Sequence, residues 1–407
     1  MATGATTGYA AGEQTNTSPV DYAQEVTYNT PPGGTYQRLR MTGESLAPQD
    51  STSTPDEIND LPEVAETVLT GRSTSGSING VLSYGTYDDF LAGILGADFF
   101  ASSVLAKNGP VTLVSKDSYR SGNDTLLYSA TGEIASWPKA GLVRIAIPSS
   151  GFDQILAYKT IYSGTTLGFD AGTLDPLMGG KATATLPEDA TVELNGITNA
   201  SLGKTYAIRK KLAGEWQVFS GNMVNQVQIQ LQKGQVPTVQ IDFVGSDMTV
   251  TTVDVSSAVN AATSSPLMDV VGGFLGCSVF GNTPAGCIQS ATITLARDGS
   301  GQDTGMGHVG ACGIQFGALK ASMDIEYFFK DYQQFLDWQS GKKGQVSVGI
   351  KGSDGYGYQF TLLNGRIFNP KNPISGKNAT IVTTISVTGN PLPGGGTFAI
   401  ARITPPS

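Results

Sequence analysis

The sequence predicts a mainly β protein built from two similar units, each with one short flanking helix, plus a small inserted β-domain. The 407 residues include 52 Gly and 20 Pro and only 14% charged residues, a composition typical of short strands joined by many turns. Residues 227–232 and 238–245 alternate apolar and polar side chains, the pattern of a strand with one buried face. A strand that leads into a short helix occurs twice, near residues 78–95 and 323–339.

Apolar residues at matching positions define the core expected for the two strand–helix units. On each helix they are spaced i, i+3 and i+4, which places them on one stripe that we expect to be buried. The expected core residues are Tyr84, Tyr87, Phe90 and Leu91 in the first unit, and Phe329, Tyr332, Phe335 and Leu336 in the second.

Each helix is also preceded by residues typical of an N-cap. Thr86 with Asp89, and Asp331 with Gln334, have the spacing of a cap and its reciprocal partner three residues later. We therefore expect both helices to begin at these positions with a side-chain cap.

The strands that follow the helices also match between the two halves. WQVFSGNMV (216–224) resembles YQFTLLNGRI (358–367), and GQVPTVQIDF (234–243) resembles GKNATIVTTI (376–385). The order strand, helix, meander thus occurs twice and predicts an internal duplication.

Composition shifts along the chain suggest four parts. Residues 1–35 have no evident core and are expected to form an extended arm that is either packed on something else or mobile. Residues 36–105 and 204–255 form the first unit, which is interrupted by a small β-domain of short strands at residues 106–203. Residues 256–407 form the second unit.

Charge and the N-terminal residues restrict the compartment and the partners. The net charge is −9, so the clustered Lys and Arg that phosphate binding needs are not expected. No apolar run approaches the roughly 20 residues of a membrane helix. The N-terminus lacks the basic and apolar regions of a signal peptide, which favours folding in a cytoplasm.

The three cysteines do not form a disulfide framework. Cys277 and Cys287 could face each other across a hairpin, but buried free thiols are the preferred interpretation, and Cys312 is left over.

The residues that chemistry would need are largely absent. His308 is the single histidine and lies in a Gly-rich segment without a motif. No HExxH or paired CxxC is present, so we expect no metal site and no cofactor. SLGKT (201–205) ends like a phosphate-binding loop, but Thr198 occupies the position where that loop needs a glycine. The sequence predicts no enzyme.

Six stretches of the chain share their pattern and order with one protein family. They are residues 39–58, 71–95, 215–248, 290–298, 323–341 and 386–403. Together they resemble the tail tube proteins of long-tailed bacteriophages, in the form with two fused tube domains. The resemblance covers nearly the whole chain after the arm, and it covers the insert only loosely.

The resemblance implies a fold and an assembly. The family fold is a β-sandwich or barrel with one flanking helix, and sheets join between subunits into an inner barrel. A single copy would form a ring of six, so a chain with two copies is expected to form a trimeric, pseudo-sixfold ring. Stacked rings would form the tube of a non-contractile tail that conducts DNA during ejection without binding it specifically.

The resemblance also implies partners and a location. The chain is expected to contact itself within and between rings, and also the tail terminator, tape measure and distal tail proteins, but no membrane. It would assemble in the cytoplasm of the host bacterium and remain in the virion tail. Residues 1–35 and the polar segment 45–62 are candidates for contacts between rings, and the insert 106–203 is expected to project outward.

Two alternatives stay open at this point. One is the inner tube of a contractile tail or secretion system. The other is a capsid decoration protein or a carbohydrate-binding adhesin, which an exposed platform of Trp and Tyr would favour.

Overall fold

The computed structural model of the chain confirms a mainly β fold. Its strands form an 18-stranded, an 8-stranded and a 2-stranded sheet. The structure describes residues 12, 15, 18–56, 58, 63–100, 103–104, 111–115, 124–129, 133–194, 196–374 and 376–405.

The large sheet contains strands from both halves of the chain. Those from the first half are β1 (Val20–Gln24), β2 (Thr35–Arg38), β3 (Gly43–Glu44), β4 (Ala47–Ser53), β5 (Val68–Val81), β14 (Gly196–Thr198), β15 (Tyr206–Leu212), β16 (Glu215–Gln232), β17 (Thr238–Gly245), β18 (Asp247–Thr251) and β19 (Ala258–Asn260). Those from the second half are β20 (Phe274–Val279), β21 (Ile288–Asp298), β24 (Ala318–Phe328), β25 (Lys343–Lys351), β26 (Gly357–Lys371), β27 (Val382–Gly389) and β28 (Phe398–Ile403).

The strand pairings follow the same order in both halves. In the first half, β1 pairs with β15, β15 with β16, and β16 with both β17 and β18, while β5 lies between β17 and β4. In the second half, β20 pairs with β25, β25 with β26, and β26 with both β27 and β28, while β24 lies between β27 and β21. All these pairings are antiparallel.

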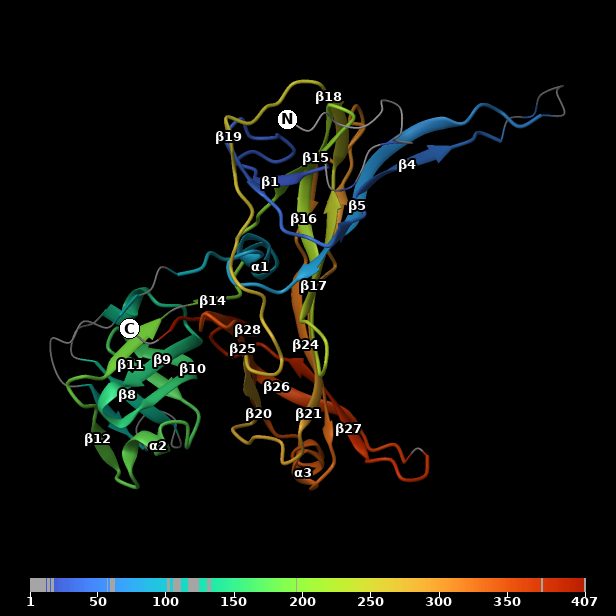
Figure 1. Cartoon of the computed structure of the whole chain (residues 1–407). Helices are drawn as coiled ribbons and strands as arrows, with labels where there is room; N and C mark the ends of the chain where they lie inside the picture. Colours follow the sequence, from blue (N-terminus) through green and yellow to red (C-terminus); the bar gives the residue numbers. More distant parts are fainter. Residues whose placement is uncertain are drawn as a thin grey trace, which may run out of the picture.

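One long ladder joins the two halves. Residues 226–232 of β16 pair antiparallel with residues 290–296 of β21. The large sheet is therefore continuous from β4 and β5, through β16 and β21, to β26 and the strands that pair with it (Figure 1).

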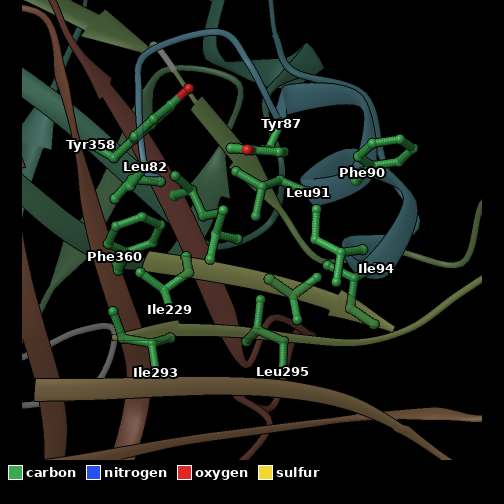
Figure 2. Packing of buried hydrophobic residues seen from close by; sticks show 14 of the residues in the cluster. Leu82, Tyr87, Phe90, Leu91, Ile94, Ile229, Ile293, Leu295, Tyr358 and Phe360 are labelled. Carbon is green, nitrogen blue, oxygen red and sulfur yellow. The ribbon is translucent and has the colours of Figure 1, made fainter. Parts of the chain in front are cut away.

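The hydrophobic core lies between this continuous sheet and the strands and helix that cover it. Helix α1 (Asp88–Leu95) packs against it, and Gly96 ends the helix in the left-handed conformation that favours glycine. Figure 2 shows Leu91 and Ile94 of α1 close to Ile229 of β16 and Leu295 of β21. Helix α3 (Gln333–Gln339) lies at the other end of the molecule.

A second, smaller core belongs to the eight-stranded sheet. Its strands are β6 (Ser103–Val104), β7 (Thr112–Val114), β8 (Thr125–Tyr128), β9 (Gly141–Ile147), β10 (Phe152–Ser163), β11 (Thr166–Phe169), β12 (Thr183–Thr185) and β13 (Thr191–Leu194), and a short helix α2 (Asp175–Met178) lies beside them. Val143, Tyr158 and Phe169 are fully buried in its core. Figure 1 shows this sheet displaced to the α1 side of the large sheet.

Two further features complete the fold. Strands β22 (Gly301–Asp303) and β23 (Gly313–Gln315) form the two-stranded sheet between β21 and β24. No helix in the described ranges is long and apolar enough to cross a membrane.

The segment 1–35, expected to be extended, contains strand β1 of the large sheet, which packs on another part of the chain. Strand β1 pairs with β15 over all five of its residues. Val20, Tyr22 and Ala23 are buried, and Tyr22 packs on the aromatic ring of Phe90. The strand is too short to show a period-two pattern, and a partner distant in sequence stabilises it. Most of residues 1–17 lie outside the described part of the chain.

Candidate functional site: the polar face and free edges of the large sheet

Three of the four residues expected in the core of the first strand–helix unit are buried. Tyr87, Phe90 and Leu91 are each no more than 1% exposed. The ring centroid of Phe90 lies 4.5 Å from that of Tyr22 and 5.2 Å from that of Phe243.

Tyr84 lies at the boundary between the two halves. It is only half-buried, and its ring stacks on Tyr358 of β26 at 5.3 Å. The hydroxyl of Tyr358 donates to Asp88 in the first turn of α1, so side chains from the second half also hold this helix.

The expected core stripe of α3 instead faces outward, and the prediction that it is buried is wrong. Tyr332 is 62% exposed and Leu336 57% exposed. Phe329 and Phe335 are half-buried, and their rings contact that of Tyr332 at 4.9 and 5.9 Å. These four residues thus form an exposed aromatic and aliphatic surface.

Polar residues take the inward side of α3. Gln334 is 2% exposed, and its Oε1 accepts a hydrogen bond of 3.1 Å from the hydroxyl of Tyr327. Asp337 is 5% exposed and accepts a hydrogen bond of 3.1 Å from Gln333. These bonds satisfy Gln334 Oε1 and Asp337 Oδ1, and they hold the helix with its apolar stripe toward solvent.

The predicted capping box of α1 does not form. The N-cap residue is Tyr87, and it makes no side-chain cap. The Thr86 hydroxyl lies 2.6 Å from that of Ser83 and 2.5 Å from that of Thr263. Asp89 accepts a hydrogen bond of 2.7 Å from Tyr22. Contacts with distant residues replace the local cap.

At α3 the cap is only partly as predicted. Asp331 accepts a hydrogen bond of 3.1 Å from the backbone N–H of Gln333 and so satisfies one amide of the first turn. Gln334 is not its reciprocal partner, because it bonds Tyr327.

One face of the central sheet is polar across both halves of the chain. On β16, Gln residues at 226, 228, 230 and 232 alternate with the buried Val227, Ile229 and Leu231. The same alternation continues on β17, β21, β24 and β27. One cross-strand row consists of Asn79, Gln240, Gln228, Thr294, Ser322, Thr388 and Arg366.

This polar face carries few charges in its centre. Among residues that point the same way as these glutamines, the ionisable ones on β17 and β24 are Asp242, Lys320, Asp324 and Glu326. Amides and hydroxyls make up most of the rest and stay neutral. The face therefore presents mainly neutral hydrogen-bonding groups and lacks the dense cationic charge that retains phosphates.

The polar segment 45–62 contains strand β4, and β4 forms a ribbon with β5. Figure 1 shows this ribbon extending away from the body of the molecule. All residues of β4 are exposed, and so are the apolar Val64 and Val68. A two-stranded ribbon is marginally stable in water by itself, so a ribbon of this kind is suited to contact another chain.

The three cysteines are free thiols, as expected. Cys277 is buried, and burial raises the pKa of its thiol to about 12. Cys287 and Cys312 are exposed, so the expectation of burial is wrong for Cys287.

Thiol reactivity checks this arrangement. We expect two of the three thiols to react rapidly with Ellman's reagent at neutral pH, because only a thiolate attacks and Cys277 is held as a thiol. The third should react only after unfolding in guanidinium chloride. Three fast thiols in the native protein would contradict the placement of Cys277.

Two further features concern the residue types that bind metals and the single histidine. No group of three His, Cys, Asp or Glu residues among the described residues could hold a metal ion. His308 is exposed in a turn beside β23.

The chain matches the model of a known protein family. The family model described as "Phage tail tube protein" matches residues 15–389. A search of the curated proteins finds no match.

Proposed function

From the premise that the chain belongs to the phage tail tube protein family, we propose that three copies close into a pseudo-sixfold ring. Stacked rings then form the hollow tube of a non-contractile tail, which conducts DNA during ejection. The family membership makes the chain a structural protein of the tail, and the finer features of the assembly are argued below from the fold.

The proposal depends first on an internal duplication. Each half has a strand–helix unit, followed by strands that pair in the same order. The long strands β16 and β26 also share a pairing pattern. The N-terminal part of each pairs with one strand, and its C-terminal part pairs with another. This order supports two copies of one ancestral domain.

The main observation in support of a ring is the strand pairing between β16 and β21. It joins the two halves edge to edge, so the chain already contains one joint between successive wedges. A repeated heterologous joint closes a ring when its rotation divides a full turn. Six wedges, two from each chain, need three chains.

The polar face of the sheet is the proposed lumen. The core and α1 lie on its other side, and so does the eight-stranded sheet in Figure 1. The lumen would then be lined mainly by Gln, Thr and Ser, with scattered carboxylates. DNA would pass along it without tight phosphate contacts.

The eight-stranded sheet is proposed to project from the outside of the tube. A contractile tail needs an outer surface against which its sheath can pack, and a projecting domain would obstruct it. We therefore favour a non-contractile tail. Tail terminator, tape measure and distal tail proteins are the proposed partners, and the host cytoplasm is the proposed place of assembly.

Negative-stain electron microscopy of the purified protein tests the assembly. We expect hollow rings or tubes whose end views have threefold or pseudo-sixfold symmetry. Closed particles or knobs without a channel would contradict the proposal.

A further inference from the structure

We infer that the edge of β26 from Arg366 to Lys371, which is free beyond Arg366, binds residues 43–47 of a second copy of this chain in one fixed antiparallel register. The inference rests on the proposed function, because it specifies the joint between neighbouring subunits of the ring.

The joint inside the chain is the template. Strand β16 has β17 on one side and β21 on the other. Strand β26 has β27 on one side, and beyond Arg366 no strand of the described chain pairs with its other side. At the opposite end of the sheet, β3 and β4 pair only with β5 within the same described ranges. The edge of β26 therefore lacks a partner strand, and the edge formed by β3 and β4 of a second copy can supply one.

The register follows from one row of paired residues, taken strand by strand. In the first half the row is Ser77, Asp242, Gln226 and then Ala296 across the joint. The sequences of the two halves are aligned so that Tyr84 matches Phe329, and Ser77 then matches Ser322. The equivalent row of the second half is therefore Ser322, Thr388 and Arg366. Arg366 therefore occupies the position that Gln226 holds at the internal joint.

The partner of Arg366 is found in the same way. Ala296 pairs with Lys320 of β24. In the same alignment of the two halves, Lys320 matches Ser75 of β5. Ser75 pairs with Ala47. Ala47 of the second copy should therefore pair with Arg366, where it would replace Lys343 at the end of β25. The same steps pair Gly43 with Lys371.

Charge favours this pair of edges. Residues 41–71 contain seven Asp or Glu and no Lys or Arg. Residues 342–377 contain six Lys or Arg and a single carboxylate, Asp354. Complementary charges speed encounter, and like charges oppose wrong pairings of two identical edges.

Side chains occupy this edge in the isolated chain. The backbone N–H of Leu46 donates to Glu44 at 2.9 Å, and Lys210 donates to the Leu46 carbonyl at 3.2 Å. Glu44 and Lys210 also pair with each other at 2.9 Å. An open strand edge invites pairing, so these contacts protect it until Ile367 of the neighbouring copy replaces them.

The positions of helices α1 and α3 on the sheet are consistent with a joint between β26 and a second copy. Figure 2 shows α1 over both β16 and β21, the two strands of the internal joint. Helix α3 packs on β26, and Gly341, just after it, lies beside the Arg366 guanidinium. The exposed Tyr332 and Leu336 are thus on a helix whose sheet is still missing a strand.

Disulfide trapping tests the register. In the full chain with Cys287→Ser and Cys312→Ser, we would combine Ala47→Cys with Arg366→Cys, assemble the protein, confirm tubes by microscopy and oxidise it. Paired residues of neighbouring strands lie within reach of a disulfide. We expect loss of the 42.4 kDa monomer band in favour of a covalent trimer on a non-reducing gel. A second pair, Gly43→Cys with Lys371→Cys, checks the same register at a glycine where an added side chain has open space.

The matched control is Gln49→Cys with Arg366→Cys, which moves the exposed Cys two residues along β4 on the same face. Tubes in which this control cross-links, or in which none of the pairs does, would overturn the inference and leave the proposed function standing. A ladder of species larger than a trimer would support the register but overturn closure by three chains. Absence of rings and tubes in the parent protein would overturn both.

Discussion

Replacing Leu91 by alanine should lower the free energy of unfolding of the isolated subunit by about 2–5 kcal/mol, because it opens a cavity under α1. Leu91 is 1% exposed and packs in the core shared by both halves. The matched change is Leu336→Ala, at the corresponding position of α3. Leu336 is 57% exposed, so its loss should change the stability by no more than about 0.5 kcal/mol.

Urea unfolding of the two variants and the parent chain, under conditions where the subunit is unassembled, measures both values. Equal losses of stability would mean that α3 buries its apolar stripe in solution, contrary to the structure. A small loss for Leu91→Ala would mean that α1 is not central to the core.

This comparison also separates what the sequence could predict from what it could not. Period-two alternation in β16 and β17 and the apolar spacing of Tyr87, Phe90 and Leu91 depend on local contacts, and they predicted the β class and the place of α1 correctly. The same spacing at Tyr332, Phe335 and Leu336 was misleading. A stripe on a helix shows that a surface is apolar, but not whether the chain itself or another molecule covers it.

The other errors have a common physical cause. Thr86 was expected to cap α1, but its hydroxyl is hydrogen-bonded to the hydroxyls of Ser83 and Thr263. Strand β1 was missed because its stability comes from β15, far along the chain. The polar row through Gln228 and Thr294 could not be found from the sequence either, because the register between strands decides which side chains lie next to each other.

That row gives a second prediction with a large effect. Gln228→Arg should make reconstituted tubes retain a short DNA duplex that tubes of the parent protein do not retain. Gln228 lies in the middle of the polar face, between Gln240 and Thr294. In the proposed ring, three arginines would enter the lumen at every level. An Arg–phosphate hydrogen bond contributes about 1.5–3 kcal/mol, so each contact should raise the affinity about tenfold or more.

Co-sedimentation of labelled duplex with tubes, over a series of salt concentrations, measures this effect. Retention by Gln228→Arg tubes should fall steeply as salt rises, because bound phosphates release counterions. Gln154→Arg provides the control: it adds the same charge at an exposed position on β10 of the eight-stranded sheet, which we place outside the tube. Retention that rises equally in both variants would mean that the Gln228 face does not line the channel, whereas retention by Gln228→Arg alone would identify this face as the path of the DNA.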